Sequence, residues 1–160
     1  MAWFASLLAR GEPALSEANV RDSPAIAPLH AASFRRGWSE NEVEGLLVDR
    51  HVVAHRAVVR GKLIGFVMSR LVEDEAEILS IAVAGRWRGR GLSHRLLTLH
   101  LRRLAGLGAR TVFLEVDENN KPAIRLYDCA GFHEISQRPN YYPVAGGKAA
   151  AALVLRRDLA

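Results

Sequence analysis

The residues most able to do chemistry lie in a loop of arginine and glycine, residues 88–93 (RGRGLS). An apolar, β-branched run at residues 78–83 precedes this loop, and apolar residues recur at helical spacing from Leu92 to Leu101 after it. A strand, a glycine-rich loop and a helix in this order present free backbone N–H groups at a helix N-terminus, which favours anions and above all a diphosphate. Glycine lets the backbone approach a phosphate closely, and arginine adds positive charge.

Two familiar phosphate-binding motifs do not fit this loop. The Walker motif ends in Gly-Lys-Ser or Gly-Lys-Thr, and the dinucleotide fingerprint requires a third glycine where this chain has His94. A plain glycine turn between a strand and a helix accounts for the spacing equally well. On the residues alone, a diphosphate site and a plain turn both remain open.

A second candidate is Glu115, the acidic residue within the apolar segment 110–116 (RTVFLEV), which we expect to be a buried strand. Burying a carboxylate without a partner costs several kcal/mol and favours its protonated form, which suits a general base. An α-amino group titrates near pH 8, so such a base needs to remove only one proton from it. Alternatively, Glu115 turns to solvent or caps the following helix, and Glu77 is then the reserve candidate.

The helix expected after this strand carries Tyr127, on the same stripe as Ile124. A phenol can donate a proton to a departing thiolate, although a packed aromatic residue accounts for Tyr127 equally simply. Asn120 is expected to cap this helix, and its amide could also bind a ligand. Cys129 is interpreted as a small buried residue and not as a nucleophile, because no histidine is paired with it in a motif.

Composition indicates one folded domain over residues 1–160, with a core at about residues 14–157. The chain has 160 residues and 49% hydrophobic content, which argues against disorder. A formal net charge of +5 permits an acidic partner such as a CoA phosphate or an RNA-rich particle, or simply indicates a solvated arginine-rich surface.

The compartment follows from cysteine usage and from the first residues. A single cysteine excludes an internal disulfide and suits a reducing compartment. The apolar patch in residues 1–10 is too short for a membrane span and lacks the basic start of a signal peptide. We therefore expect a soluble, cytoplasmic protein without a membrane partner. We also expect no metal site, because His51 and His55 lie on a predicted strand outside any metal-binding motif.

The elements that must position these residues follow from apolar periodicity, capping residues and turn signals. In order, we expect a strand at 14–18, a helix capped by Ser23, a helix opened by a capping box of Ser39 and Glu42, a hairpin at 52–68, a strand at 77–83, a helix at 92–107, a strand at 110–116, a helix from Asn120 to Gly131, a strand at 132–136, an aromatic loop at 138–143, a turn at 146–147 and a strand at 151–155. Trp38, before the second helix, is either a hydrophobic staple or part of a substrate cleft.

The arginine–glycine loop resembles the Arg/Gln-x-x-Gly-x-Gly/Ala loop with which the GNAT acyltransferase superfamily holds the pyrophosphate of acetyl-CoA. Ser93 stands where that family usually has glycine or alanine. Six further segments look like consecutive motifs of one branch, the bacterial ribosomal-protein alanine N-acetyltransferases (RimI type): residues 38–40, 81–83, 114–116, 119–124, 126–132 and 138–143. The resemblance covers most of the chain from Trp38 onward.

The resemblance implies an α/β GNAT-type fold: a central, mixed and mostly antiparallel sheet with helices on both faces, its strands parting beside the loop. It implies Glu115 as proton acceptor and Tyr127 as proton donor in direct transfer, with an N–H near Val83 steadying the oxyanion. The residues implied to hold acetyl-CoA are Ile81, Ala82, Val83, Arg88, Gly89, Arg90, Gly91, Leu92, Ser93, His94 and Asn120. Trp38, Tyr141 and Tyr142 would shape the slot for a protein N-terminus, that of a ribosomal protein beginning with alanine.

One departure concerns the acceptor. Where the family usually shows Gly-Arg-Glu-Asp-Ala, residues 147–151 read GKAAA, so that two acidic residues near the slot are absent. These acidic residues bear on the family's preference for a basic residue after the N-terminal alanine. Other protein N-termini or a small amine therefore stay open as acceptors. A non-catalytic protein that binds acetyl-CoA or RNA is a further alternative, against which the presence of Glu115 and Tyr127 counts.

Overall fold

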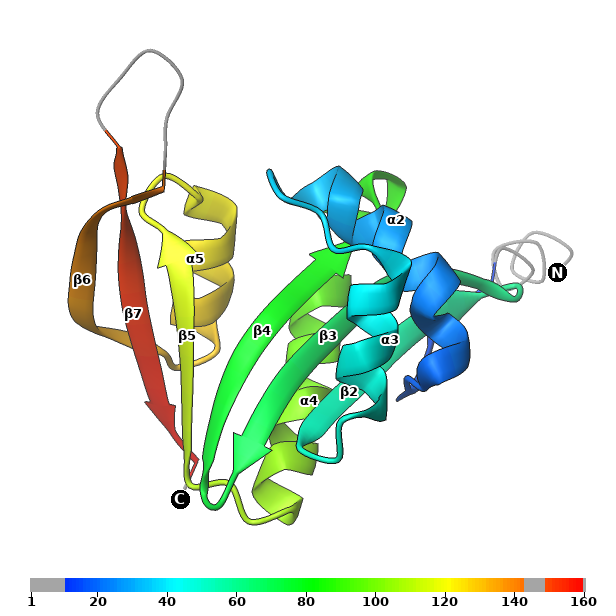
Figure 1. Ribbon diagram of the computed structural model, residues 1–160, viewed down its shortest axis with the longest axis horizontal. Coiled ribbons are helices and arrows are strands. Elements are labelled where there is room, and N and C mark those ends of the chain that lie inside the picture. Colours follow the sequence, from blue (N-terminus) through cyan, green and yellow to red (C-terminus); the bar gives the residue numbers. More distant parts are fainter. Residues whose placement is uncertain (1–10, 143–148, 160) are drawn as a thin grey trace, which may run out of the picture.

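The computed structural model of the protein describes residues 11–142 and 149–159 (Figure 1). The strands are β1 (Ala14–Glu17), β2 (Val52–Val59), β3 (Lys62–Val72), β4 (Glu75–Val83), β5 (Thr111–Asp117), β6 (His133–Tyr142) and β7 (Ala150–Asp158). The helices are α2 (Ser23–Ser33), α3 (Glu40–Val48), α4 (Leu92–Gly106) and α5 (Lys121–Cys129), with short 3₁₀ turns η1 (Val20–Asp22) and η2 (Gly85–Trp87).

The strands form one seven-stranded sheet in the order β1-β2-β3-β4-β5-β7-β6. β4 and β5 are the parallel neighbours, and every other neighbouring pair among the described strands is antiparallel. The predicted mixed, mostly antiparallel sheet is therefore confirmed. β7 lies between β5 and β6 although it follows both of them in the sequence.

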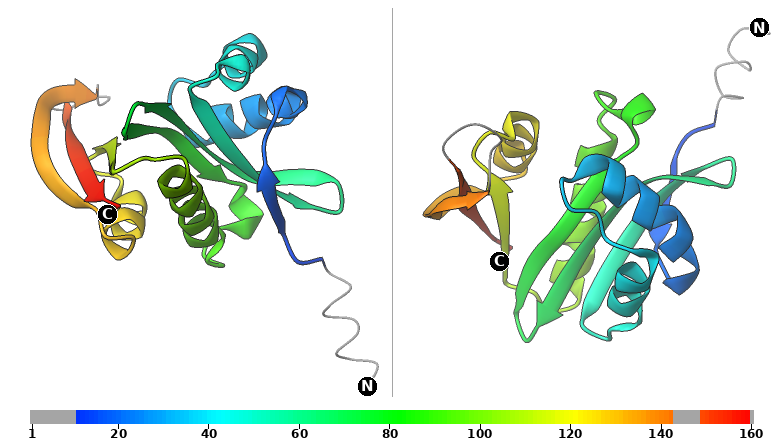
Figure 2. Two further views of the ribbon diagram at one scale, coloured as in Figure 1. Left: turned by 90° about the horizontal axis from the view of Figure 1, so that it is seen from below. Right: turned by 45° about the horizontal axis from the view of Figure 1, so that its top comes forward.

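Helices cover both faces of the sheet, as predicted: α2 and α3 lie on one face, and α4 and α5 on the other (Figures 1 and 2). The α4 face buries the larger apolar core, which includes Leu96, Leu97 and Leu104 of α4. The other face buries a smaller cluster around Ile26 of α2 and Phe66 of β3. Apolar residues spaced along each helix thus select which side of the helix faces the sheet.

The sheet parts between β4 and β5. These strands pair only where Glu75–Glu77 lies beside Thr111–Phe113, and Figure 1 shows them diverging from there. Within β4 the register against β3 shifts, because Met68 pairs with Ser80 while Ser69 pairs with Ile78. This β-bulge leaves one extra residue in β4 and bends the strand.

Local sequence signals account for the starts of α2 and α3, with one correction. The capping box before α3 is confirmed: Ser39 Oγ accepts the Glu42 N–H at 3.1 Å, and Glu42 accepts the Ser39 N–H at 2.8 Å. The assignment of Ser23 as an N-cap is wrong, since Ser23 is already the first residue of α2. A second capping box, formed by Asn19 and Asp22, builds η1 directly ahead and moves the helix start.

The predicted aromatic loop at 138–143 is wrong up to residue 142, because β6 continues through Tyr142. Proline is tolerated here because β6 is the edge strand and the register against β7 shifts between Arg138 and Tyr142. Asn140, with a φ of 56°, supplies the left-handed residue in this bulge. The turn predicted at 146–147 lies outside the described residues.

Three polar side chains form a buried chain beneath α4. His100 of α4 lies 2.6 Å from Ser69 Oγ through Nε2 and 2.7 Å from His55 Nδ1 through Nδ1. Burial lowers the pKa of His100 to about 3, and it also lowers the pKa of His55. Both rings are therefore neutral at pH 7, which lets one ring donate a hydrogen bond to the other.

Candidate active site

The start of α4 is built to receive an anion. Gly89 and Gly91 have φ values of 73° and 77°, a left-handed conformation that glycine adopts without strain. Gly91 is the N-cap of α4 and has no side chain, and the first helical turn contains no acidic residue. The first backbone N–H groups of α4, from Leu92, Ser93 and His94, therefore lack a side-chain cap and can bind an anion.

Two arginines of the loop contact neighbouring residues. Arg88 Nε donates a hydrogen bond to the Val83 carbonyl at 3.2 Å, which ties the loop to the end of β4. The Arg90 guanidinium lies 5.0 Å from the centre of the Trp87 ring, within cation–π range. Both positive charges thus stay beside the helix N-terminus.

The end of β4 offers a free strand edge next to this loop. Ile81, Ala82 and Val83 pair with β3 on one side. On the other side, the pairing of β4 with β5 stops at Glu77. In the described structure, the edge of residues 81–83 that faces β5 is therefore not paired with a strand, and its backbone groups can bond an extended ligand.

Glu115 faces the opening between β4 and β5. Along β5 the side chains of Val112, Leu114 and Val116 are buried, so the alternating side chain of Glu115 lies on the opposite face of the sheet. Of the alternatives that the sequence left open, Glu115 is neither an unpartnered buried carboxylate nor a helix cap: its side chain is 24% exposed and forms an ion pair with Arg138 Nη1 at 3.1 Å. The carboxylate is therefore reachable from solvent and already has a cationic partner.

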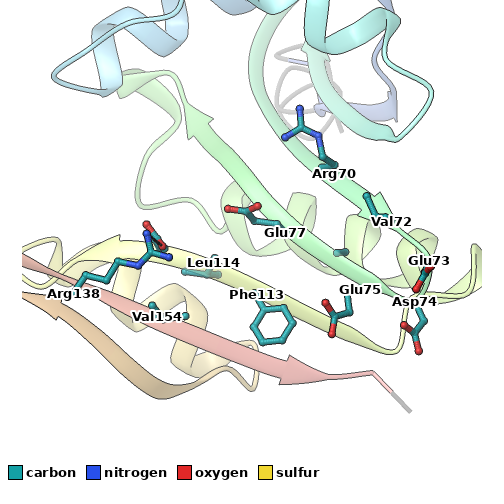
Figure 3. Close-up of a pocket in the computed structure, with 12 residues that line it drawn as sticks. Arg70, Val72, Glu73, Asp74, Glu75, Glu77, Phe113, Leu114, Arg138 and Val154 are labelled. Carbon is teal, nitrogen blue, oxygen red and sulfur yellow. Dashed lines mark ion pairs between the residues drawn. The ribbon is translucent and has the colours of Figure 1, made fainter. Parts of the chain in front are cut away.

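A groove of about 580 Å³ begins at this carboxylate and follows the base of the parting (Figure 3). In Figure 3, Glu77 and Arg70 come from one side of it, while Leu114, Val154 and Arg138 come from the other. The groove is lined by Arg70, Val72, Glu73, Asp74, Glu75, Ala76, Glu77, Phe113, Leu114, Glu115, Arg138 and Val154. Its lining is rich in carboxylates, with the apolar Phe113 and Val154 between them.

The two predicted acceptor tyrosines lie at the same end of the sheet as Glu115. Burial raises the pKa of Tyr142, and the nearby charge of Glu115 raises it further, which places the Tyr142 hydroxyl in the field of that carboxylate. Tyr141 is half exposed and packs edge-on against Tyr142 at 5.1 Å. The β6 bulge thus brings both rings to the neighbourhood of Glu115.

Trp38 takes part in packing. Its ring stacks on His30 at 3.9 Å, and its backbone N–H donates to His30 Nδ1 at 3.0 Å. Burial lowers the pKa of His30 to about 4, so this nitrogen is free to accept the bond at neutral pH. Trp38 packs against the cluster that contains Val43, as expected of a staple, and it is not among the described residues that line the groove.

Tyr127 lies on the opposite face of β5 from Glu115. It belongs to the core on the α4 and α5 side and packs edge-on against Phe132 at 5.6 Å. Burial raises the pKa of Tyr127, so the phenol keeps its proton through neutral pH. Glu115 and Tyr127 therefore do not share one surface, and they lie on the two sides of the strand that borders the parting.

The remaining predicted residues of α5 have separate outcomes. Asn120 is the N-cap of α5, as expected, and its Oδ1 accepts the Ala123 N–H at 3.3 Å. This bond leaves the Nδ2 group of Asn120 available to a ligand. The prediction of a buried Cys129 is wrong, since this thiol is exposed at the end of the helix.

A sheet that parts between two parallel strands, beside a glycine–arginine loop and an uncapped helix N-terminus, is the arrangement expected of a GNAT-type, acetyl-CoA-dependent acetyltransferase. The sequence matches the acetyltransferase (GNAT) family over residues 16–132, and the protein belongs to this family. Acetyl-CoA is thus its co-substrate. Within residues 11–142 and 149–159, no helix is both long and apolar enough to cross a membrane.

Among characterised proteins, the chain is similar to the ribosomal protein bS18-alanine N-acetyltransferase of Escherichia coli strain K12. The two are 31% identical over 140 residues, which cover 88% of this chain and 94% of the relative. The Salmonella typhimurium enzyme of the same name is 32% identical over 133 residues, covering 83% and 89%.

Solved structures show the same fold. The crystal structure of the Escherichia coli ribosomal-protein-S18-alanine N-acetyltransferase superimposes with a TM-score of 0.86 at 28% identity, covering 93% of this chain and 95% of that one. Arabidopsis thaliana NAA60 in complex with a bisubstrate analogue superimposes with a TM-score of 0.82 at 21% identity, covering 92% and 98%. The GNAT-type fold predicted from the sequence is confirmed.

Proposed function

We propose that the protein transfers the acetyl group of acetyl-CoA to the N-terminal α-amino group of a ribosomal protein that begins with alanine. The observation that carries the proposal is the placement of Glu115 at the wall of an open groove beside the parting, in a chain similar over most of its length to ribosomal protein bS18-alanine N-acetyltransferases. A groove open to solvent suits an extended peptide N-terminus, which must enter from outside.

The chain's own residues fit acetyl-CoA on structural grounds. The uncapped start of α4, with Gly89, Arg90 and Gly91 before it, suits the pyrophosphate. The free edge at Ile81–Val83 suits the pantetheine arm, whose amides can bond it as a strand would, and Nδ2 of Asn120 is a further donor. When bound, acetyl-CoA supplies an activated thioester.

In the proposed reaction, the neutral amine attacks the thioester carbonyl carbon, a C–N bond forms and the C–S bond breaks. Glu115 accepts the proton that the amine nitrogen loses, directly or through a water. A backbone N–H at the free edge near Val83 stabilises the negative oxygen that develops on the carbonyl. The parting holds the two reactants together, so the attack takes place within one complex.

Tyr127 acts at the sulfur. Its raised pKa keeps the phenol protonated, and it also makes Tyr127 a weaker acid than an ordinary thiol, whose pKa is about 8.5. Complete release of its proton to a free thiolate would therefore be unfavourable. We assign to Tyr127 a hydrogen bond from its hydroxyl to the departing sulfur, which stabilises the negative charge as the C–S bond breaks; the thiolate then takes its proton from solvent.

The acidic groove bears on the choice of acceptor. Ala149 and Ala150 stand where the family that the sequence resembles usually has its acidic pair, and Ala150 is buried at the start of β7. Glu75 and Glu77 of β4 nevertheless line the groove and give it negative charge. An acceptor with a basic residue after its N-terminal alanine therefore meets carboxylates on the opposite wall.

The test is CoA release from acetyl-CoA with short peptides beginning Ala-Arg, Ala-Glu and Met-Glu, and with an Ala-Arg peptide whose N-terminus is blocked. Turnover of the Ala-Arg peptide alone is expected. Turnover of the acidic peptides at equal rates would show a broader acceptor range. If small amines are acetylated and none of the peptides is, the proposed acceptor is overturned.

A further inference from the structure

Arg138 is the residue that contacts the proposed base. Its Nη1 lies 3.1 Å from Oε1 of Glu115, and of the ion pairs that the described residues form, this is the one that includes Glu115. The guanidinium is bound to Oε1, and no other described residue forms an ion pair with Glu115, which leaves Oε2 without a cationic partner at the lining of the groove. The pair therefore divides the carboxylate into an anchored oxygen and a free one.

The fold holds Arg138 in this place. Arg138 pairs with Ala152 on β7, and Ala152 pairs in turn with Asp117 on β5, two residues beyond Glu115. Paired residues share a face of the sheet, so the arginine side chain crosses β7 over the methyl group of Ala152 to reach Glu115. On its other side the guanidinium lies 5.8 Å from the centre of the Tyr141 ring, at the edge of cation–π range.

The charge of Arg138 acts at the point where an amine must lose its protons. An α-amino group has a pKa of about 7.7–8.0 and is mostly an ammonium ion at pH 7, which has no lone pair for attack. An amine that delivers a proton to Glu115 lies about 3 Å from that carboxylate, and therefore close to the guanidinium as well. A neighbouring positive charge disfavours the ammonium form.

We propose that Arg138 is a positioning residue for the reaction: it anchors Oε1 of Glu115, leaves Oε2 to take the amine proton, and favours the neutral, nucleophilic amine at that site. This inference rests on the proposed function, since it needs an amine acceptor in the groove. The ammonium first releases one proton to solvent, and Glu115 takes the second as the C–N bond forms.

The other charged and titratable groups around this point are mostly acidic. Those that line the groove or lie beside Glu115 are Asp117 on β5, Tyr141 and Tyr142 on β6, Glu75 and Glu77 on β4, Glu73 and Asp74 in the turn between β3 and β4, and Arg70 on β3. Arg70 lies 3.9 Å from Asp49, outside the ion pair of Glu115. Without Arg138, the carboxylates would favour the ammonium form of the acceptor amine, so that the amine would lose its proton only at higher pH.

The test compares the pH dependence of kcat/KM between pH 6 and 9 for the wild-type protein, Arg138→Met, Arg138→Lys and the matched control Arg103→Met. The Arg103 side chain on α4 is 50% exposed, against 59% for Arg138, and it forms an ion pair with Glu17 at 3.4 Å. In the plot of kcat/KM against pH, we expect Arg138→Met to shift the rising limb to higher pH by about one unit. At pH 7 this shift lowers kcat/KM about tenfold. We expect Arg138→Lys to keep the limb near its wild-type position, while the KM for acetyl-CoA stays unchanged in all variants.

An unshifted limb in Arg138→Met would overturn the inference, as would equal shifts in Arg138→Met and Arg138→Lys or a matching shift in Arg103→Met. These outcomes are separable from failure of the proposed function. If peptides are acetylated and the pH dependence of kcat/KM is the same in Arg138→Met as in the wild type, only the proposed role of Arg138 is refuted. If a small amine alone is turned over, the protein acceptor falls and the same comparison is made with that amine. If no amine is turned over, both fall.

Discussion

Replacing His100 with glutamine should make the protein less sensitive to acid. The His100 ring is fully buried between Ser69 and His55, and its pKa in the folded protein is about 3, against about 6.5 in an unfolded chain. Below pH 6.5 the unfolded chain binds a proton that the folded protein does not, so folding stability falls as the pH decreases. At pH 5, 1.5 units below the unfolded value, this loss amounts to about 2 kcal/mol at about 1.4 kcal/mol per unit.

The assay is urea unfolding at pH 7.5 and pH 5.0 for the wild-type protein, His100→Gln and the exposed control His133→Gln. Glutamine does not titrate, and its amide can still hydrogen-bond Ser69. Between the two pH values, we expect the free energy of unfolding to fall by about 2 kcal/mol less in His100→Gln than in the wild-type protein, and His133→Gln to behave like the wild type. An equal fall in the wild type and in His100→Gln would refute the assignment of acid sensitivity to this ring.

Three further predictions concern the reaction and its co-substrate. Glu115→Gln should lower kcat about 10²-fold or more while leaving acetyl-CoA binding unchanged in a calorimetric titration, and full activity would remove Glu115 from its role as base. Tyr127→Phe should lower kcat in steady-state assays with little change in KM for either substrate, and a wild-type kcat would show that Tyr127 only packs. Gly91→Ala places a methyl group on a residue with a φ of 77° and should cost about 1–2 kcal/mol, or about tenfold in acetyl-CoA affinity. Gly85→Ala is its control, because a Cβ at Gly85 meets no atom within 4 Å and its φ is not left-handed; equal losses in both variants would contradict the argument from backbone conformation.

Sequence patterns predicted the elements whose signals are local. The capping box of Ser39 and Glu42 marked the start of α3, and Gly108 followed the end of α4 closely. Both features depend on residues within one helical turn, so no distant contact could override them. The alternation of side chains in residues 111–117 also indicates that Glu115 is more exposed than its neighbours, because the buried positions are Val112, Leu114 and Val116.

The errors arose where distant strands decide the outcome. Pro139 and Asn140 are typical of a loop, yet the edge position beside β7 keeps residues 133–142 in a strand with a bulge. Arg138 was seen only as part of that expected loop, since its contact with Glu115 spans 23 residues and no local spacing predicts it. The prediction of an acetyl-CoA-dependent enzyme is confirmed by the family match, whereas the roles of individual site residues remain predictions.

The place of β7 in the sheet has a consequence for the order of folding. Strands β2, β3 and β4 are joined by two tight hairpins, so each of these pairings closes a short loop, whereas residues 18–51 separate β1 from β2. β5 cannot pair with β7 until residues 150–158 are available, and β6 gains its strand partner only from the same segment. Contacts of such long sequence separation form slowly. We therefore expect the half of the sheet that carries Glu115 and Arg138 to assemble after the β2–β3–β4 hairpins, so that a refolding chain gains part of its far-ultraviolet signal before it regains activity.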